Sequence, residues 1–206
     1  YLGYMRQDKR FQPRECISAK TVAKLIDSLK PDLFITVDIH SDTVLSYFQT
    51  KALNVSSMAQ IGRWLKDQNL TNPLIVSPDL GAIDRAKEVT SNIGYGDYDY
   101  LEKKRDIATG AATTREKTID AADRDVVIID DIISTGGTIA NAAKIAKRAG
   151  ARRVIAACTH ALLVGDSRKR MTEAGVDQIV GTDTVESDVS LISVAEPIAE
   201  VLRTAF

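Results

Sequence analysis

The densest group of residues that could carry out chemistry follows an apolar run in the second half of the chain. Residues 126–129 are all β-branched and apolar, which predicts a strand buried on both faces, as in the middle of a parallel sheet. Asp130 and Asp131 stand at the carboxyl end of this strand, where open α/β sheets bind their ligands. Residues 139–149 then have strong helical propensity.

The polar turn between this strand and helix has the residue types of a phosphate-binding loop. Glycines let the backbone turn sharply and approach a ligand, and the free amides of a helix N-terminus favour an anion. We therefore interpret the turn as a phosphate site beside two carboxylates that could hold sugar hydroxyls or a metal. The simpler alternative is a strand–turn–helix whose hydroxyls only cap the helix. The turn consists of Ser134, Thr135, Gly136, Gly137 and Thr138.

Three further polar clusters follow predicted strand ends: residues 6–10 follow a strand end predicted at residues 1–4, and the other two are residues 38–41 and 77–81. Taken singly, His40 and Asp79 are more simply explained as structural, since an aspartate after a proline often caps a helix. Their shared position at strand ends suggests a joint role. Imidazole and carboxylate could together hold Mg²⁺ carried by a nucleotide, because Mg²⁺ takes few protein ligands and several phosphate oxygens.

A basic cluster opens a stretch with little periodicity. Lys103 and Arg105 are separated by one residue on a segment predicted to be extended, so both project to the same side and could clamp a polyphosphate. A solvated basic turn is the simpler alternative. Residues 106–123 show no clear structural pattern, and unstructured stretches of that length are often functional lids.

Predicted strands and helices alternate along most of the chain. This order implies a mostly parallel sheet with helices on both faces. The periodicity predicts helices over residues 14–29, 56–65, 83–92, 139–149, 167–174 and 195–206, and strands over 33–37, 74–76, 98–101, 126–129, 153–159, 178–180 and 191–194.

The composition narrows the functional classes. A length of 206 residues allows one large or two small domains, and 44% hydrophobic with 27% charged residues is ordinary for a globular protein. A net charge of −1 does not suggest a general nucleic-acid binder. Cys16 and Cys158 each lie in predicted regular structure, which favours a reducing setting, and we expect a cytoplasmic protein. No apolar run approaches the ~20 residues of a membrane span.

The order of the polar motifs resembles one family, ribose-phosphate pyrophosphokinase, also called phosphoribosyl pyrophosphate synthetase. The motifs span nearly the whole chain with family-like spacing, and five in order are far more specific than one. They are Arg6-Gln7-Asp8-Lys9, Asp38-Ile39-His40-Ser41, Ser77-Pro78-Asp79, Lys103-Lys104-Arg105 and residues 130–138.

The resemblance implies two similar domains of the phosphoribosyltransferase type, the first of them incomplete. Residues 1–70 would be the remainder of the N-terminal domain, and residues 71–192 a second domain with the ribose 5-phosphate site. Residues 193–206 would form a closing helix that packs back on the first domain. The family normally has several strands before its Arg-Gln-Asp loop, so we expect a fragment or a short member.

The resemblance also implies the substrates, ATP and ribose 5-phosphate, and a homo-oligomer of two or more subunits. Arg6, Gln7, Asp8 and His40 would contact ATP, and His40 with Asp79 would bind the Mg²⁺ of MgATP. Lys103 would be the catalytic lysine, with Arg105 beside it. Asp130 and Asp131 would hold the ribose hydroxyls, and residues 134–138 the 5-phosphate. Many family members carry Asp in place of Ser134, whose hydroxyl can still donate to phosphate.

Two other functions share parts of this pattern. A purine or pyrimidine phosphoribosyltransferase uses the same carboxylate pair and Thr-Gly-Gly-Thr turn, but it would not need the loop at residues 6–9 or the pair His40 and Asp79. A non-catalytic partner of an active synthetase would keep the fold, but it should have lost Lys103 and Arg105, and both are present.

Overall fold

The computed structural model describes residues 1–10, 12–101, 103–105, 112–114 and 118–205. By its internal contacts the chain forms two compact units, Tyr1–Ser57 with Val194–Phe206, and Met58–Ser193. The sequence analysis placed a boundary at residue 70, whereas these contacts group residues 58–70 with the second unit. The assignment of two similar domains stays a prediction.

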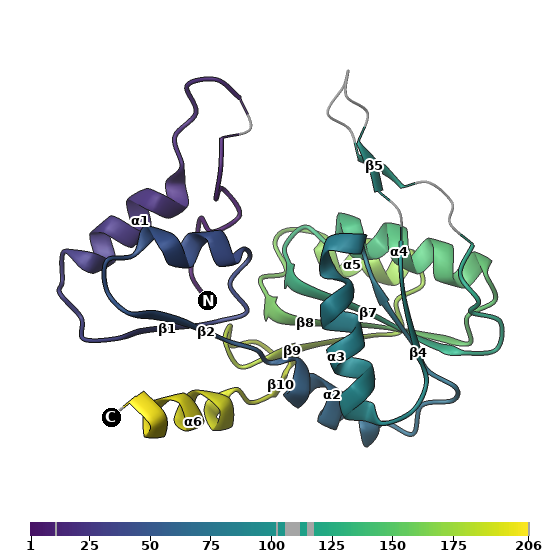
Figure 1. Ribbon diagram of the computed structural model, residues 1–206. Coiled ribbons are helices and arrows are strands. Elements are labelled where there is room, and N and C mark those ends of the chain that lie inside the picture. Colours follow the sequence, from purple (N-terminus) through teal and green to yellow (C-terminus); the bar gives the residue numbers. More distant parts are fainter. Residues whose placement is uncertain (11, 102, 106–111, 115–117, 206) are drawn as a thin grey trace. The chain divides into compact units, whose positions relative to one another are not determined.

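The second unit is built on a six-stranded sheet (Figure 1). Its strand order is β10-β9-β8-β7-β3-β4, and every neighbouring pair is parallel. The strands are β3 (Leu74–Ser77), β4 (Asp97–Tyr100), β7 (Asp125–Ile133), β8 (Arg153–Ala161), β9 (Gln178–Thr182) and β10 (Ser190–Ile192).

Helices cover both faces of this sheet. Val126 and Ile128 belong to a core shared with α4 and α5, whereas Val127 and Ile129 belong to a second core shared with α2 and α3. Successive side chains of a strand point to opposite faces, which is why one apolar run supplies both cores. The predicted α/β class, with mostly parallel strands and helices on both faces, is confirmed. The helices are α2 (Met58–Lys66), α3 (Ile83–Ile93), α4 (Gly137–Arg148) and α5 (Ser167–Glu173), with a short 3₁₀ turn η2 (Leu80–Ala82).

Strand β7 is longer than its four predicted apolar residues. It continues to Ile133, so Asp130 and Asp131 lie within its carboxyl-terminal half rather than behind it. The reason is its neighbour β8, which pairs with β7 as far as Ile133, opposite Ala161. On the other side, pairing with β3 ends at Ile128, opposite Val76. The last residues of β7 are therefore bonded to β8 alone.

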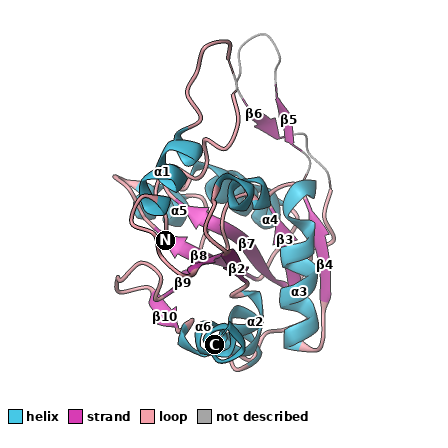
Figure 2. Cartoon of the chain, turned by 60° about the vertical axis from the view of Figure 1, so that its left-hand side comes forward, coloured by secondary structure: helices cyan, strands magenta, loops and turns pink. Residues whose placement is uncertain are grey.

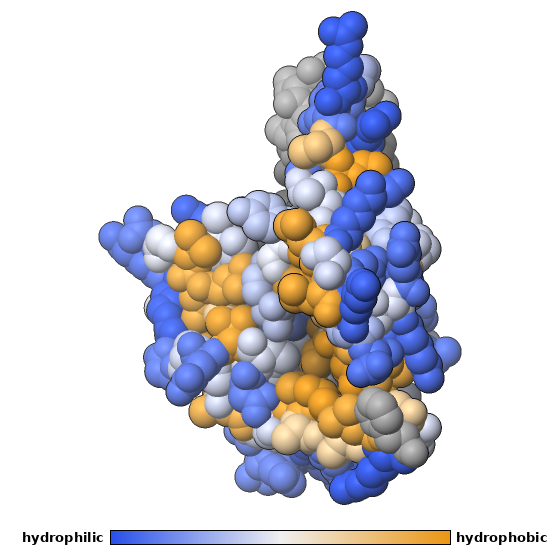
Figure 3. All heavy atoms as spheres, turned by 90° about the vertical axis from the view of Figure 1, so that its left-hand side faces the viewer, coloured by the Kyte–Doolittle hydropathy of each residue, from blue (hydrophilic) through white to orange (hydrophobic). Residues whose placement is uncertain are grey.

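The first unit is smaller. It contains α1 (Ser18–Asp27), β1 (Phe34–Val37), a 3₁₀ helix η1 (Asp42–Tyr47), β2 (Ala52–Val55) and α6 (Ala195–Ala205). β1 and β2 are parallel, and β2 and η1 were not predicted from the sequence. The core includes Met5, Ala19, Ile39 and Val44. Apolar residues also remain on the surface, and Figure 3 shows them among hydrophilic ones on one face of the molecule.

A two-stranded antiparallel ribbon, β5 (Lys103–Arg105) with β6 (Ala112–Thr114), follows β4 (Figure 2). β6 falls within the stretch for which the sequence showed no structural pattern. The remaining residues of the predicted lid, at positions 106–111 and 115–117, lie outside the described residues. In the part of the chain that the structure describes, no helix combines the length and apolar character needed to cross a membrane.

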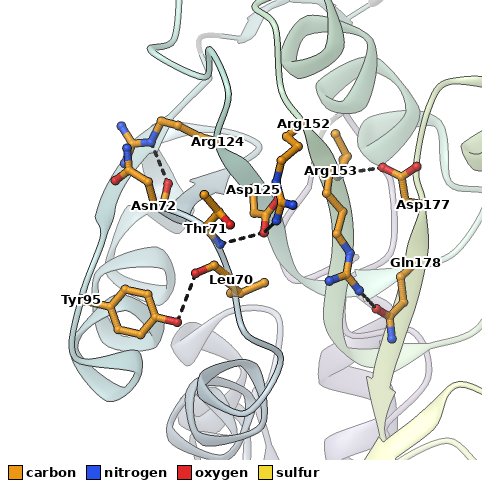
Figure 4. Close-up of polar contacts among 11 residues, drawn as sticks. Leu70, Thr71, Asn72, Tyr95, Arg124, Asp125, Arg152, Arg153, Asp177 and Gln178 are labelled. Atoms are coloured by element: carbon orange, nitrogen blue, oxygen red, sulfur yellow. Dashed lines mark hydrogen bonds and ion pairs between the residues drawn. The ribbon is translucent and has the colours of Figure 1, made fainter.

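Charged side chains form hydrogen bonds that link the amino ends of the strands (Figure 4). The Asp125 side chain is fully buried, and its Oδ2 accepts a hydrogen bond from the Thr71 amide at 2.9 Å. Arg152 Nε donates to Asp125 Oδ1 at 2.9 Å, and the Val154 amide donates to Asp177 Oδ2 at 2.7 Å. These bonds hold one end of the sheet, so the opposite end is the one left for a ligand.

Candidate functional site

The carboxylate pair lies at the carboxyl end of the sheet. Because side chains alternate along β7, Asp130 continues the face that carries α4, and Asp131 continues the face that carries α3. Asp130 Oδ1 accepts a hydrogen bond from the Asp131 amide at 2.9 Å, and Asp131 Oδ1 accepts one from the Ile132 amide at 2.9 Å. Both carboxylates are thus held by the backbone of their own strand.

Burial and mutual repulsion govern the charge of this pair. Asp131 is 3% exposed. Burial, reinforced by the neighbouring charge of Asp131, raises the pKa of Asp130, while the positive charge of Arg85 opposes the rise. Burial also raises the pKa of the Cys158 thiol, and the charge of Asp130 adds to this effect, so Cys158 is a neutral, inert neighbour. The pair therefore resists full ionisation, and its ionised oxygens are the acceptors for hydrogen bonds from sugar hydroxyls.

The turn after β7 has the backbone shape that its glycines predicted. Gly136 takes a left-handed conformation with φ of +73° and directly precedes α4. A Cβ at this position would lie 3.0 Å from Met171 Cγ and 3.1 Å from the Ser167 carbonyl oxygen, so only glycine fits without strain. The turn is held from outside as well, since the Val164 amide donates to the Ser134 carbonyl at 3.0 Å and Arg170 donates to the Thr135 carbonyl.

This turn therefore directs a helix N-terminus to the carboxyl edge of the sheet. Ser134, Gly137 and Thr138 are half-buried, Thr135 is exposed and Gly136 is buried. The first amides of α4 have no partner within their own helix, which favours an anion at this place. The structure thus brings together the residues from Asp130 to Thr138 in one strand–turn–helix.

Asp79 lies at the end of β3, which neighbours β7 in the same sheet. It is half-buried and precedes η2. The Ser77 hydroxyl donates to the Asp79 carbonyl at 2.8 Å, which fixes the turn. Asp79 therefore shares the carboxyl edge of the sheet with the carboxylate pair.

His40 lies in the first unit, on a turn after β1. The turn is fixed by Asp38, a buried residue with φ of +41°. Its Oδ2 accepts hydrogen bonds from the amide and the hydroxyl of Ser57, at 2.9 and 2.6 Å. Asp38 is thus structural, and His40 is half-buried. Because His40 and Asp79 belong to different units, their shared role in holding a metal stays a prediction.

The loop that carries Arg6, Gln7 and Asp8 is tied to its own unit. Gln7 Oε1 accepts a hydrogen bond from the Ser18 hydroxyl at 2.7 Å, and the Asp8 carbonyl accepts one from the Tyr47 hydroxyl at 2.6 Å. Gln7 and Asp8 are half-buried, whereas Arg6 is exposed. The role of these residues toward ATP stays a prediction.

Lys103 and Arg105 are the two ends of β5. Their side chains lie outside the described part of the structure, so their predicted catalytic role is untested by the geometry.

Sequence reasoning missed one residue of the site, Arg85. Its Nη2 lies 3.4 Å from Asp131 Oδ2, and it comes from the first turn of α3. The available signal was its position six residues after Asp79, at the start of a helix that follows a strand. Its partner could not be read from the sequence, because the order of the strands decides which helix lies beside β7.

Comparison with known proteins identifies relatives in sequence and in fold. The family model for the phosphoribosyl transferase domain matches residues 50–193. A ribose-phosphate pyrophosphokinase 2 from Archaeoglobus fulgidus is 45% identical over 97% of this chain and 71% of its own length. A ribose-phosphate pyrophosphokinase from Methanothermobacter thermautotrophicus is 40% identical over 98% of this chain and 70% of its own length.

A solved structure shows the same fold. The phosphoribosylpyrophosphate synthetase from Mycobacterium smegmatis matches the whole chain and 69% of its own chain, with a TM-score of 0.82 and 27% identity. The fold of the phosphoribosyltransferase type is therefore established, as is the relationship in sequence. The chain belongs to the ribose-phosphate pyrophosphokinase family of transferases.

Proposed function

We propose that this protein transfers the β,γ-diphosphoryl group of ATP to the 1-hydroxyl of ribose 5-phosphate. The products are phosphoribosyl pyrophosphate and AMP. The observation that carries the proposal is the match to relatives of this name over 97–98% of the chain, because it includes the loop at residues 6–9 and the basic segment at residues 103–105, which a phosphoribosyltransferase would not need.

The sugar phosphate would bind at the carboxyl end of β7. Asp130 and Asp131 would accept hydrogen bonds from the ribose hydroxyls, since ionised carboxylates only accept. The 5-phosphate would lie against the turn at residues 134–138, where the amides that begin α4 favour an anion. The left-handed Gly136 supports this arrangement, because it lets the turn present those amides together.

Transfer of the diphosphoryl group depends mainly on position and charge. We assign ATP binding to Arg6, Gln7, Asp8 and His40. Lys103 and Arg105 would offset the negative charge that builds on the transferred group and on the departing AMP. These two residues stand directly before the predicted lid at residues 106–123. Closure of that lid would exclude water from the site.

We also propose that Mg²⁺ is the cofactor. The donors would be His40 and the carboxylate of Asp79, of which the carboxylate is the type that Mg²⁺ prefers. In the described residues no three His, Cys, Asp or Glu side chains gather around one point. An ion carried on ATP needs only one or two protein ligands, so this donor set fits it. When bound, the ion would neutralise charge on the phosphate oxygens.

The test is an assay of AMP release from ATP and ribose 5-phosphate. We expect AMP to form only when both substrates and Mg²⁺ are present. Release of pyrophosphate that depends on an added purine or pyrimidine base would instead favour a phosphoribosyltransferase. Binding of ATP by calorimetry without any AMP release would identify a non-catalytic relative.

We further propose a cytoplasmic homo-oligomer of two or more subunits, as the resemblance implies. Light scattering coupled to size-exclusion chromatography gives the mass of the particle directly. A particle with the 22.4 kDa mass of one chain would contradict the proposed assembly.

A further inference from the structure

Arg85 is a cation beside the carboxylate pair. Its side chain is 24% exposed, and its Nη2 lies 3.4 Å from Asp131 Oδ2, on a carboxylate that is itself 5% exposed. An exposed ion pair contributes little, but here one partner is almost fully withdrawn from water. The interaction is therefore screened far less than one on the surface.

The groups that face the pair come from three directions. Arg85 approaches from α3, on the face of Asp131. Cys158 lies on β8, directly opposite Asp130 in the strand register, and its thiol is neutral. Further along β8, His160 Nδ1 lies within hydrogen-bond distance of the Thr184 hydroxyl oxygen, at 2.8 Å. From α5, Arg170 donates to the Thr135 carbonyl. Arg85 thus supplies an opposing charge to the pair.

We propose that Arg85 is a positioning residue for ribose 5-phosphate, which holds Asp131 and favours the ionised form of the pair, so that both carboxylates can accept hydrogen bonds from the sugar hydroxyls. The inference rests on the proposed function, because it takes the sugar to be the ligand of this pair. Arg85 acts through Asp131, on the opposite face of the sheet from the phosphate turn. It thus needs no contact with the substrate.

The physical reason is the closeness of two like charges. Two adjacent carboxylates with little water around them resist holding both charges at once, and the pair then tends to keep a proton. A protonated carboxyl loses an acceptor that a sugar hydroxyl needs. The opposite charge of Arg85 favours the fully ionised pair. Without it, binding of the sugar should require a higher pH.

The experiment measures the dissociation constant of the whole chain for ribose 5-phosphate by calorimetry, across a series of pH values and without ATP. The variants are Arg85→Gln and Arg85→Met, which remove the charge, and Arg85→Lys, which keeps it. Lys87→Ala is the control, because Lys87 is an exposed cation on the same helix. Circular dichroism identifies the variants that fold.

We expect wild-type binding to weaken as the pH falls through the apparent pKa of the pair. In either neutral variant this weakening should begin about one pH unit higher. At a pH below the apparent pKa of the pair in both proteins, this shift corresponds to an about tenfold larger Kd for the variant. Arg85→Lys and Lys87→Ala should keep the wild-type pH dependence. A purely structural ion pair would change thermal stability and leave the pH dependence in place.

An unshifted pH dependence in the neutral variant that folds overturns the inference, whatever its affinity. So does an equal shift in Arg85→Lys, because charge would then not be the cause. Wild-type protein that binds no ribose 5-phosphate overturns the inference together with the sugar site. Binding with the expected pH dependence, but without AMP release, would leave Arg85 in its role and reject the proposed function alone.

Discussion

At the scale of single residues, buried carboxyl groups have different roles at the two ends of the sheet. Asp125, at the amino end of β7, is surrounded by donors from Thr71 and Arg152. Asp130, five residues on, shares its surroundings with another carboxylate, and burial raises its pKa. The first arrangement stabilises the fold, whereas the second leaves the two carboxyl groups available to a ligand that brings hydrogen-bond donors of its own.

Replacement of Asp125 by Ala should destabilise the protein by about 2 kcal/mol, because the buried Asp125 carboxylate accepts hydrogen bonds from the Thr71 amide and from the half-exposed Arg152 side chain. The control is Asp188→Ala, since Asp188 pairs with Arg168 but its side chain is 74% exposed. That variant should lose less than about 1 kcal/mol. Urea denaturation measures the free energy of unfolding of both variants, and equal losses would show that burial of the Asp125 carboxylate does not matter.

Replacement of Lys103 by Ala tests the proposed catalytic lysine. The side chain would stabilise charge that develops during transfer rather than hold the substrates. We therefore expect kcat to fall far more than the affinity for ATP or ribose 5-phosphate. Steady-state AMP release gives kcat, and calorimetry gives the two affinities. An unchanged kcat would remove Lys103 from the mechanism.

At the scale of elements, the unit that matters is β7, its turn and α4. The strand is held in the middle of the sheet, and the turn is held by the Val164 amide and by Arg170. Hydrogen bonds to the carbonyls of Ser134 and Thr135 thus hold the turn of the proposed phosphate site. The left-handed Gly136 is the point where strand direction changes into helix direction.

Gly136→Ala should lower the melting temperature and weaken ribose 5-phosphate binding. The new Cβ would meet Met171 and the Ser167 carbonyl at a backbone φ of +73°, and we expect a cost of about 1–3 kcal/mol. Gly137→Ala is the matched variant for stability, because its Cβ would meet no atom closer than Thr135 Oγ1 at 4.0 Å. Thermal unfolding measures the melting temperatures of the two variants, and equal values would contradict the prediction.

At the scale of the whole molecule, stability should be distributed unevenly between the two units. In the second unit, β7 and β8 are each paired on both sides, and both faces are covered by apolar cores. In the first unit the sheet has two strands and the core is small. Regions with few buried apolar contacts open more readily.

Hydrogen exchange should reflect this difference. We expect the amides of residues 126–129 and 154–157 to exchange most slowly, and those of α1 and β1 to exchange by local opening at lower free energy. Exchange followed by mass spectrometry on the intact chain measures both groups. Equal protection of β1 and β7 would show that the chain opens only as one cooperative body.

Much of this architecture followed from local pattern. The β-branched run at residues 126–129 predicted a strand buried on both faces, because only a central strand can bury consecutive apolar side chains. The turn after it was predicted from glycine and hydroxyl residues, whose backbone preferences act locally. β2 and β6 were missed because they carry little apolar pattern and become strands through pairing with β1 and β5.

The sequence by itself determined the α/β class, the strand–turn–helix from Asp130 to Thr138 and the family, since these depend on residue types at short spacing. Only the tertiary structure decided that β7 extends to Ile133, because β8 continues to supply hydrogen-bond partners. It also decided that Asp38 is structural and that Arg85 lies beside Asp131. These outcomes depend on which strands become neighbours, and the packing of the whole sheet sets that order.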